Sequence, residues 1–102
     1  MILNLISTKE ILDFEQEIGV QLEVNERKPS LRGKRFYVAF KDSSVMEPGV
    51  LIGKYGDGDT IDEALVDYCQ RVSHQRIAFN CYSQDRKEID FPKLIHTKFI
   101  NK

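Results

Sequence analysis

The stretch YGDGD, residues 55–59, holds the side chains that come nearest to a metal or phosphate site. Asp57 and Asp59 stand at alternate positions, as the first oxygen ligands of a calcium loop do, but later ligand positions carry Ile61 and Tyr68. A phosphate loop would need a lysine followed by serine or threonine at the start of a helix, and two carboxylates repel an anion. We therefore expect neither a metal nor a cofactor at this stretch.

A tight corner that leads into a helix explains the same residues. Gly56 and Gly58 are expected to take positive φ angles, which glycine adopts without steric cost. Thr60 and Glu63 have the spacing of a capping box, in which side chains bond the free backbone N–H groups at the start of a helix. The sequence thus predicts a structural role for this corner.

Histidine and cysteine, the most common catalytic bases and nucleophiles, each occur only twice in the chain. No pattern in the sequence directs the side chain of His74 or His96 toward a serine or cysteine nucleophile, so both are expected at the surface. Cys69 and Cys81 lack the spacing of a metal or redox pair and are expected to be reduced structural thiols. We predict that the protein is not an enzyme.

A basic segment between residues 25 and 35 is the candidate contact for nucleic acid. Proline, serine and glycine mark this segment as an exposed loop, and Tyr37 follows it closely. Such a loop can hold a phosphate backbone, although a solvated loop is the more common outcome, and the net charge of -1 adds no global attraction. The basic residues are Arg27, Lys28, Arg32, Lys34 and Arg35.

The first element that must position these side chains is a short helix. Ser7 and Glu10 form a capping box, and apolar residues then recur at helical spacing up to Gly19. These signals predict a helix over 8–18 that ends at a left-handed glycine. Its outer face, which includes Glu15, is acidic.

Strands are expected to follow this helix. Alternating apolar residues predict a half-buried strand over 20–24, and the aromatic and β-branched run RFYVAFK predicts a strand over 35–41. A third strand is expected over 50–55. The residues between, 42–49, are expected to form a mobile hairpin tip with Met46 as an exposed apolar side chain.

The second half of the chain begins with the second helix. Apolar residues between Ile61 and Val72 form one continuous stripe, which must pack on a sheet. Alternation predicts a further strand over 76–82, and a short extended piece is expected around 89–91. Residues 93–102 have little pattern and are expected to be a weakly ordered tail.

Together these elements predict one α+β domain over residues 1–92. Its expected architecture is two layers, with two helices on one face of a mainly antiparallel sheet of three to five strands, in the order α-β-β-β-α-β. A chain of 102 residues with 41% hydrophobic and 30% charged residues is large enough for one core. Its N-terminus shows neither a membrane segment nor a secretion signal, so we expect a cytoplasmic protein.

Resemblances to known families cover parts of this pattern. The order helix, three strands, helix resembles the double-stranded RNA-binding domain in outline, but residues 61–64, at the start of the second helix, carry acidic and apolar side chains where that family has lysines. Residues 35–73, and above all GDTIDEAL at 58–65, resemble the toxin-binding half of the HicB antitoxins. A helix and a strand precede the matching region, unlike that family. With ER at 26–27, YGDGDTIDEALVDY at 55–68 and RKEIDFP at 86–92, the whole chain is similar to small proteins encoded by phages and prophages of Gram-positive bacteria.

These observations lead to two functional hypotheses. The first is a non-enzymatic, phage-type module that binds a host or phage protein, with a host-takeover, anti-defence or antitoxin-like role. Its candidate contacts are the apolar Met46 and Tyr82 and the acidic Glu15 and Asp67, which can mimic nucleic acid toward a basic partner. The alternative is a nucleic-acid-binding protein that uses the basic 27–35 loop. An unpaired edge strand also makes a homodimer possible.

Overall fold

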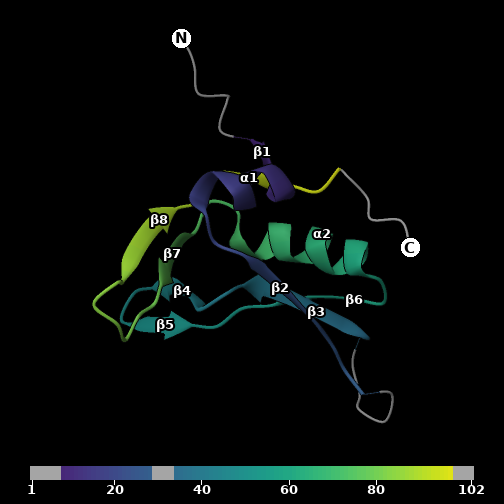
Figure 1. Ribbon diagram of the computed structural model, residues 1–102, viewed down its shortest axis with the longest axis horizontal. Coiled ribbons are helices and arrows are strands. Elements are labelled where there is room, and N and C mark those ends of the chain that lie inside the picture. Colours follow the sequence, from purple (N-terminus) through teal and green to yellow (C-terminus); the bar gives the residue numbers. More distant parts are fainter. Residues whose placement is uncertain (1–7, 29–33, 98–102) are drawn as a thin grey trace.

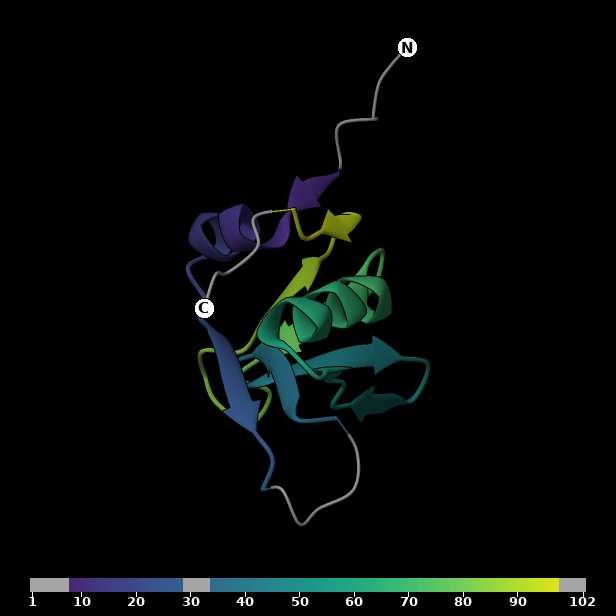
Figure 2. The same ribbon diagram turned by 90° about the vertical axis from the view of Figure 1, so that its right-hand side faces the viewer.

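A long antiparallel hairpin, bent at its middle, forms the centre of the sheet (Figure 1). The computed structural model describes residues 8–28 and 34–97. The strands of the hairpin are β3 (Phe36–Phe40), β4 (Ser43–Glu47), β5 (Val50–Ile52) and β6 (Gly56–Gly58). The first arm runs through β3 and β4, and the second returns through β5 and β6, so that Val45 lies opposite Ile52 and Val38 opposite Gly56. Figure 2 shows the two halves running in different directions.

Three further strands extend the hairpin along its first arm. They are β2 (Leu22–Glu26), β7 (Arg76–Phe79) and β8 (Lys87–Asp90). Strand β2 pairs with β3, whereas β7 pairs with β4 and carries β8 on its other side, and all of these pairs are antiparallel. The two halves of the sheet therefore have the orders β2-β3-β6 and β5-β4-β7-β8.

The bend of the sheet is marked by two residues with left-handed backbone. Asp42 has φ 53° and Asn80 has φ 55°, and Asn80 N–H donates to the carbonyl of Asp42 at 3.0 Å. Aspartate and asparagine tolerate this conformation better than other non-glycine residues do. The first arm can therefore change direction between β3 and β4 while its hydrogen-bond partner changes from β2 to β7.

Two helices, α1 (Ile11–Ile18) and α2 (Ile61–Val72), lie on the same side of the sheet (Figures 1 and 2). Buried side chains from both helices and from β3, β4 and β7 form the core. Phe14 of α1 meets the ring of Phe91 at 4.9 Å between centroids, edge to face, and Phe91 in turn meets Phe40 at 5.6 Å. This arrangement confirms the predicted α+β architecture with both helices on one face.

The ends of the first helix agree only in part with the prediction. Gly19 has φ 70° and its N–H donates to the carbonyl of Glu15 at 3.1 Å, as expected of a left-handed C-terminal residue. The helix begins at Ile11 rather than at residue 8, because Glu10 is its N-cap and accepts a hydrogen bond from Leu12 N–H at 2.7 Å. The predicted partner Ser7 lies outside the described residues.

The prediction of a mobile tip over 42–49 is wrong. Residues 43–47 form β4, which pairs on both sides, and the turn of the hairpin is only Pro48 and Gly49, with φ 81° at the glycine. Met46 is therefore half-buried in a strand opposite Leu51 instead of exposed at a tip.

The segment after residue 92 also differs from the expected weak tail. Strand β9 (Leu94–Ile95) pairs in parallel with β1 (Lys9–Glu10), and Leu94 and His96 are buried. Residues 98–102 lie outside the described part of the chain. Within residues 8–28 and 34–97, neither helix has the length and apolar character needed to span a bilayer.

Candidate functional site

The two glycines of the acidic corner serve close packing. A Cβ atom on Gly56 would lie 2.2 Å from the carbonyl oxygen of Ala64, and one on Gly58 would lie 2.3 Å from the backbone nitrogen of Ala64. Helix α2 thus rests directly on the backbone of β6. The prediction of positive φ at both glycines is wrong, because in the described chain only Gly19 and Gly49 have positive φ among the glycines. The glycines are needed for space rather than for a turn.

The carboxylates of the corner are all engaged within the protein. Asp57 pairs with Arg27 at 2.8 Å and Asp59 with Lys34 at 3.4 Å. The N–H of Asp59 donates to Glu63, whose own N–H donates to Thr60 Oγ1 at 3.1 Å. The predicted cap of α2 is confirmed, with the return bond made to Asp59. Among the described residues, no cluster of histidine, cysteine and carboxylate side chains could hold a metal ion.

Asp67 was a predicted partner contact, but it joins α2 to the corner. Its carboxylate accepts the N–H of Asp57 at 2.8 Å and pairs with Arg71 at 2.8 Å. Partial burial raises the pKa of Asp67, but the hydrogen bonds from Asp57 N–H and Arg71 together outweigh it, so the net pKa is lowered below its ordinary 3.8. The folded state therefore favours the ionised form.

Protonation of Asp67 at low pH should therefore lower the free energy of unfolding. Because its folded pKa lies below the unfolded one, its contribution is complete above the unfolded pKa and is lost as the pH falls through the folded pKa. We expect the free energy of unfolding to drop less steeply between about pH 5 and pH 3 in Asp67→Asn than in the wild type. Urea titrations at each pH measure this slope. Asp85→Asn, at an exposed turn, is the control and should keep the wild-type slope.

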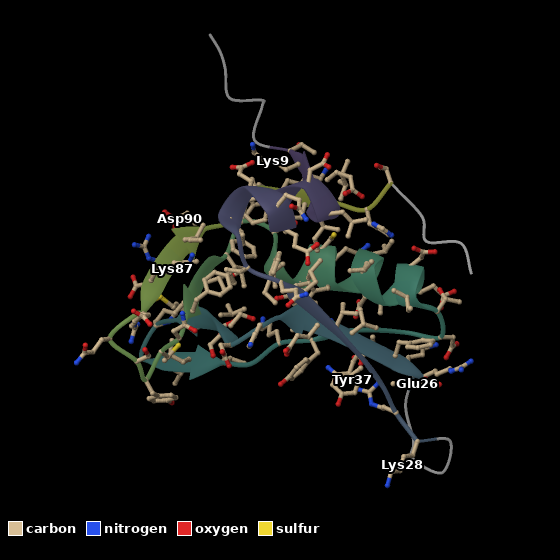
Figure 3. All side chains as sticks on the ribbon, in the orientation of Figure 1. Lys9, Glu26, Lys28, Tyr37, Lys87 and Asp90 are labelled. Carbon is tan, nitrogen blue, oxygen red and sulfur yellow. The ribbon has the colours of Figure 1, made fainter. Side chains whose placement is uncertain are left out.

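In the part of the basic loop that the structure describes, most basic side chains form ion pairs with carboxylates. Arg27 pairs with Asp57 and its guanidinium lies 4.5 Å from the ring centroid of Tyr37, while Arg35 pairs with Glu26 at 2.6 Å. With the Lys34 pair already described, three of the predicted basic contacts face carboxylates. Lys28 is exposed near the end of the β2–β3 hairpin (Figure 3), and Arg32 lies outside the described residues.

The acidic face predicted for the first helix is also engaged internally. Glu15 is half-buried and accepts the N–H of Leu22 at 2.8 Å, which ties α1 to the start of β2. Glu17 pairs with Lys9 at 2.8 Å. Glu15 and Glu17 therefore both have partners within the protein.

A buried histidine between two carboxylates was missed by the sequence prediction. His96 Nδ1 lies 3.1 Å from Glu10 and Nε2 lies 2.9 Å from Asp62, and its side chain is fully buried. Glu10 also accepts the N–H of Thr97 at 2.9 Å. The prediction of a surface histidine is wrong for His96 and confirmed for His74, which is exposed. No local signal links Glu10 and His96, because they stand 86 positions apart.

The two cysteines are free thiols, as predicted. Cys69 is buried on the inner face of α2, and burial raises its pKa to about 12. A thiol with such a pKa is a poor nucleophile near neutral pH. Cys81 is partly buried and follows β7.

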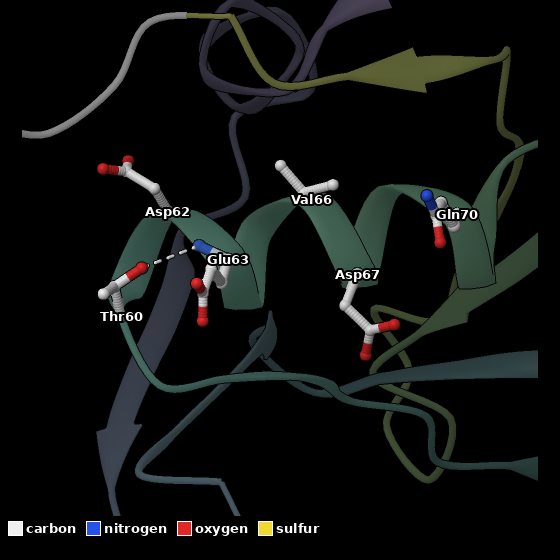
Figure 4. Close-up of a pocket in the computed structure, with 6 residues that line it drawn as sticks. All are labelled: Thr60, Asp62, Glu63, Val66, Asp67 and Gln70. Atoms are coloured by element: carbon white, nitrogen blue, oxygen red, sulfur yellow. Dashed lines mark hydrogen bonds between the residues drawn. The ribbon is translucent and has the colours of Figure 1, made fainter.

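The flank of α2 has a shallow hollow of about 460 Å³ (Figure 4). Val66 lies at its centre, but the carboxylates around it have the structural partners described above. The polar groups that line this hollow therefore contribute to the fold. Its lining residues are Thr60, Asp62, Glu63, Val66, Asp67 and Gln70.

The outer face of the sheet, on the side away from the helices, carries exposed tyrosines. Tyr37 lies on this face (Figure 3), and the ring of Tyr55 meets it edge to face at 5.5 Å between centroids. Tyr55 is 50% exposed, and Tyr82, in the turn after β7, is 99% exposed. The prediction that Tyr82 is exposed is confirmed.

Two adjacent hollows lie at the bend of the sheet, with volumes of about 380 and 210 Å³. They share the lining residues Asp42 and Ser43, and the two hollows together are here called the bend groove. Tyr82 lines one hollow and Tyr55 the other. The remaining lining residues are Glu23, Asn25, Ala39, Phe40, Ser44, Asn80, Cys81 and Ser83.

A comparison of the chain with protein families, curated proteins and solved structures finds no match. The resemblances to HicB antitoxins and to phage proteins therefore stay predictions. The structure does supply a physical reason for one motif of the HicB-like stretch, since Gly58, Thr60 and Glu63 are required wherever a capped helix packs against a strand backbone.

Proposed function

We propose that the protein is a non-enzymatic protein-binding module that engages its partner through the bend groove. One observation carries the proposal: the groove is lined by two solvent-exposed tyrosines, Tyr55 and Tyr82. A non-enzymatic role is supported by the burial of His96 and by the burial of Cys69, which raises the pKa of that thiol to about 12.

The chemistry of the groove supports recognition of a protein surface. Tyrosine, serine and asparagine dominate its lining, and these residue types recur in surfaces that bind proteins, where tyrosine gives large contact area and serine and asparagine give adaptable hydrogen bonds. A fully exposed tyrosine contributes nothing to the isolated fold. The expected phage-type setting and the resemblance of residues 35–73 to HicB antitoxins agree with a protein partner.

Loss of the tyrosines should abolish partner binding. We expect Tyr55→Ala combined with Tyr82→Ala to lose a specific protein that the immobilised wild-type chain retains from a host lysate at moderate salt, with an affinity loss of about 2 kcal/mol or more. The retained band is identified and its binding to purified variants is measured by titration. Val66→Ala is the matched control, because Val66 is an exposed apolar residue on the helix side of the sheet. This variant should bind the partner as the wild type does.

Retention of the same partner by the double tyrosine variant would refute the bend groove as the binding surface. Retention of no specific protein by the wild type would count against the function itself. Circular dichroism of each variant confirms that the fold is kept, which is expected because Tyr55 and Tyr82 lie outside the core.

Nucleic-acid binding is the second candidate, and the stack of Arg27 on Tyr37 beside Tyr55 favours it. Aromatic rings with adjacent arginines on an open sheet face bind single-stranded nucleic acid in many proteins. The ion pairs of Arg27, Lys34 and Arg35 oppose it. A titration with single-stranded RNA at two salt concentrations separates the candidates, because phosphate contacts predict affinity that falls steeply with salt.

A further inference from the structure

The free edge of β5 is the most apolar edge of the sheet. Within the described chain β5 pairs with β4 alone, so its other side has no strand neighbour. Val50 is 52% exposed and Leu51 is 37% exposed. The other outer edges differ, because β2 carries Glu23 and Glu26 and β8 carries three charged residues among its four. Charged side chains are the usual protection of an edge strand, and β5 lacks them.

We propose that β5 pairs antiparallel with β5 of a second copy of this chain, around a two-fold axis through Leu51. This register places Leu51 opposite Leu51 and Val50 opposite Ile52 of the second copy. Gly49 then lies opposite Gly53. Each of these pairs is apolar or glycine, so the strand is complementary to itself, as an interface around a two-fold axis requires.

The backbone of the hairpin selects this register. A two-residue turn at Pro48 and Gly49 makes Glu47 and Val50 the pair that closes the hairpin, so the N–H and C=O groups of Val50 and Ile52 point toward β4. The same groups of Leu51 point away from β4, toward the free edge. Only an axis at Leu51 pairs these groups with their own copies. An axis at Val50 would place Ile52 opposite Pro48 in the turn, and an axis at Ile52 would place Val50 opposite Lys54, so each of these registers loses an apolar pair.

The dimer would join two four-stranded halves into one continuous sheet. Residues directly opposite each other in antiparallel strands lie on the same face. Leu51 pairs with Met46 and therefore lies on the face opposite to Val45 and Ile52, which is the outer face of the sheet. The two bend grooves would then open on the same side of the dimer. The inference goes beyond the proposed function, since no residue of β5 lines the groove.

Sedimentation of the full chain over a range of concentrations tests the proposal. We expect a monomer–dimer equilibrium that Leu51→Lys shifts to monomer, because two lysines would meet at the axis. Val66→Lys is the matched control, since Val66 on α2 has the same exposed fraction, 37%, and this variant should dimerise as the wild type does. A wild-type monomer at every concentration, or a dimer that Leu51→Lys leaves intact, would overturn the proposal.

A disulfide across the axis gives a second test that does not depend on loss of association. In a Cys81→Ser background, Leu51→Cys should cross-link to itself on mild oxidation, because opposite residues of antiparallel strands lie about 5.5 Å apart between Cα atoms, within disulfide range. Val24→Cys, on the edge strand β2, is the control and should form no cross-link. Cross-linking through Val24→Cys but not through Leu51→Cys would show that the dimer forms at the β2 edge. That result would overturn the proposal. Tyr82→Ala should leave association unchanged, which separates this test from that of the groove.

Discussion

Gly56→Ala and Gly58→Ala should each destabilise the protein by about 3 kcal/mol or more, a large share of the stability of a domain of this size. The added methyl group would meet backbone atoms of α2 and not the end of a movable side chain. On Gly56 it would also lie 2.4 Å from Cβ and from the backbone nitrogen of Tyr68. Relief would require α2 to lift from β6 and the core beneath it to open.

Urea unfolding followed by circular dichroism measures this loss. Gly53→Ala is the matched control, because a Cβ there meets nothing within 4 Å and φ lies outside the left-handed region. That variant should be neutral or slightly stabilised, since alanine restricts the unfolded chain. Gly49→Ala should cost about 1 kcal/mol, from backbone strain at φ 81° alone. If Gly56→Ala and Gly53→Ala unfold at the same urea concentration, the close contact of α2 with β6 is wrong.

Glu10→Ala should cost about 3 kcal/mol or more, because it removes one carboxylate from a cluster of hydrogen bonds around the buried His96. Glu10 accepts hydrogen bonds from Leu12 N–H and Thr97 N–H and faces His96 Nδ1. Its loss leaves these groups without that acceptor, and the His96 side chain is fully buried. The effect should include detachment of β9 from β1, since Glu10 is the last residue of β1.

The control for this change is Glu17→Ala. Glu17 makes an exposed ion pair with Lys9 at 2.8 Å, and such pairs contribute about 0.5 kcal/mol or less. Thermal unfolding gives the difference in stability, and amide hydrogen exchange at Leu94 and Ile95 reports detachment of β9. Equal melting temperatures for Glu10→Ala and Glu17→Ala would show that the cluster contributes no stability.

The parts of the fold that the sequence predicts well depend on local signals. Helix α2 combines a complete apolar stripe with the Thr60 cap, and its bounds agree with the predicted range. Strand β3 was predicted from its aromatic and β-branched residues alone. Gly19 ends α1 for the expected reason. In each case the residues that decide the structure lie within one or two turns of one another.

The parts that were predicted wrongly depend on partners far along the chain. Strand β4 has the polar sequence SSVME, and only its pairing with β7 on one side and β5 on the other makes it a strand. Gly56 and Gly58 looked like turn residues, because a sequence does not show that a helix will rest on them. His96 is buried through contacts with segments 34 and 86 positions away.

The candidate site was predictable to a smaller extent than the fold. Tyr82 was identified correctly as exposed, whereas Met46 is half-buried in β4 and Asp67 bonds the N–H of Asp57. The bend groove depends on a backbone hydrogen bond between Asp42 and Asn80, two residues with left-handed backbone. They lie far apart in the sequence, so no local pattern predicts their contact.

The pairing of β1 with β9 has a consequence for biosynthesis. The ribosome makes Glu10 early, but its partners in β9 and at His96 emerge only after the rest of the described chain has been translated. The nascent polypeptide can assemble the hairpin and α2 while α1 still lacks its final anchor. The pairing of β1 with β9 therefore cannot form until residues 94–97 have been translated, so α1 gains this anchor later than the hairpin and α2 can form.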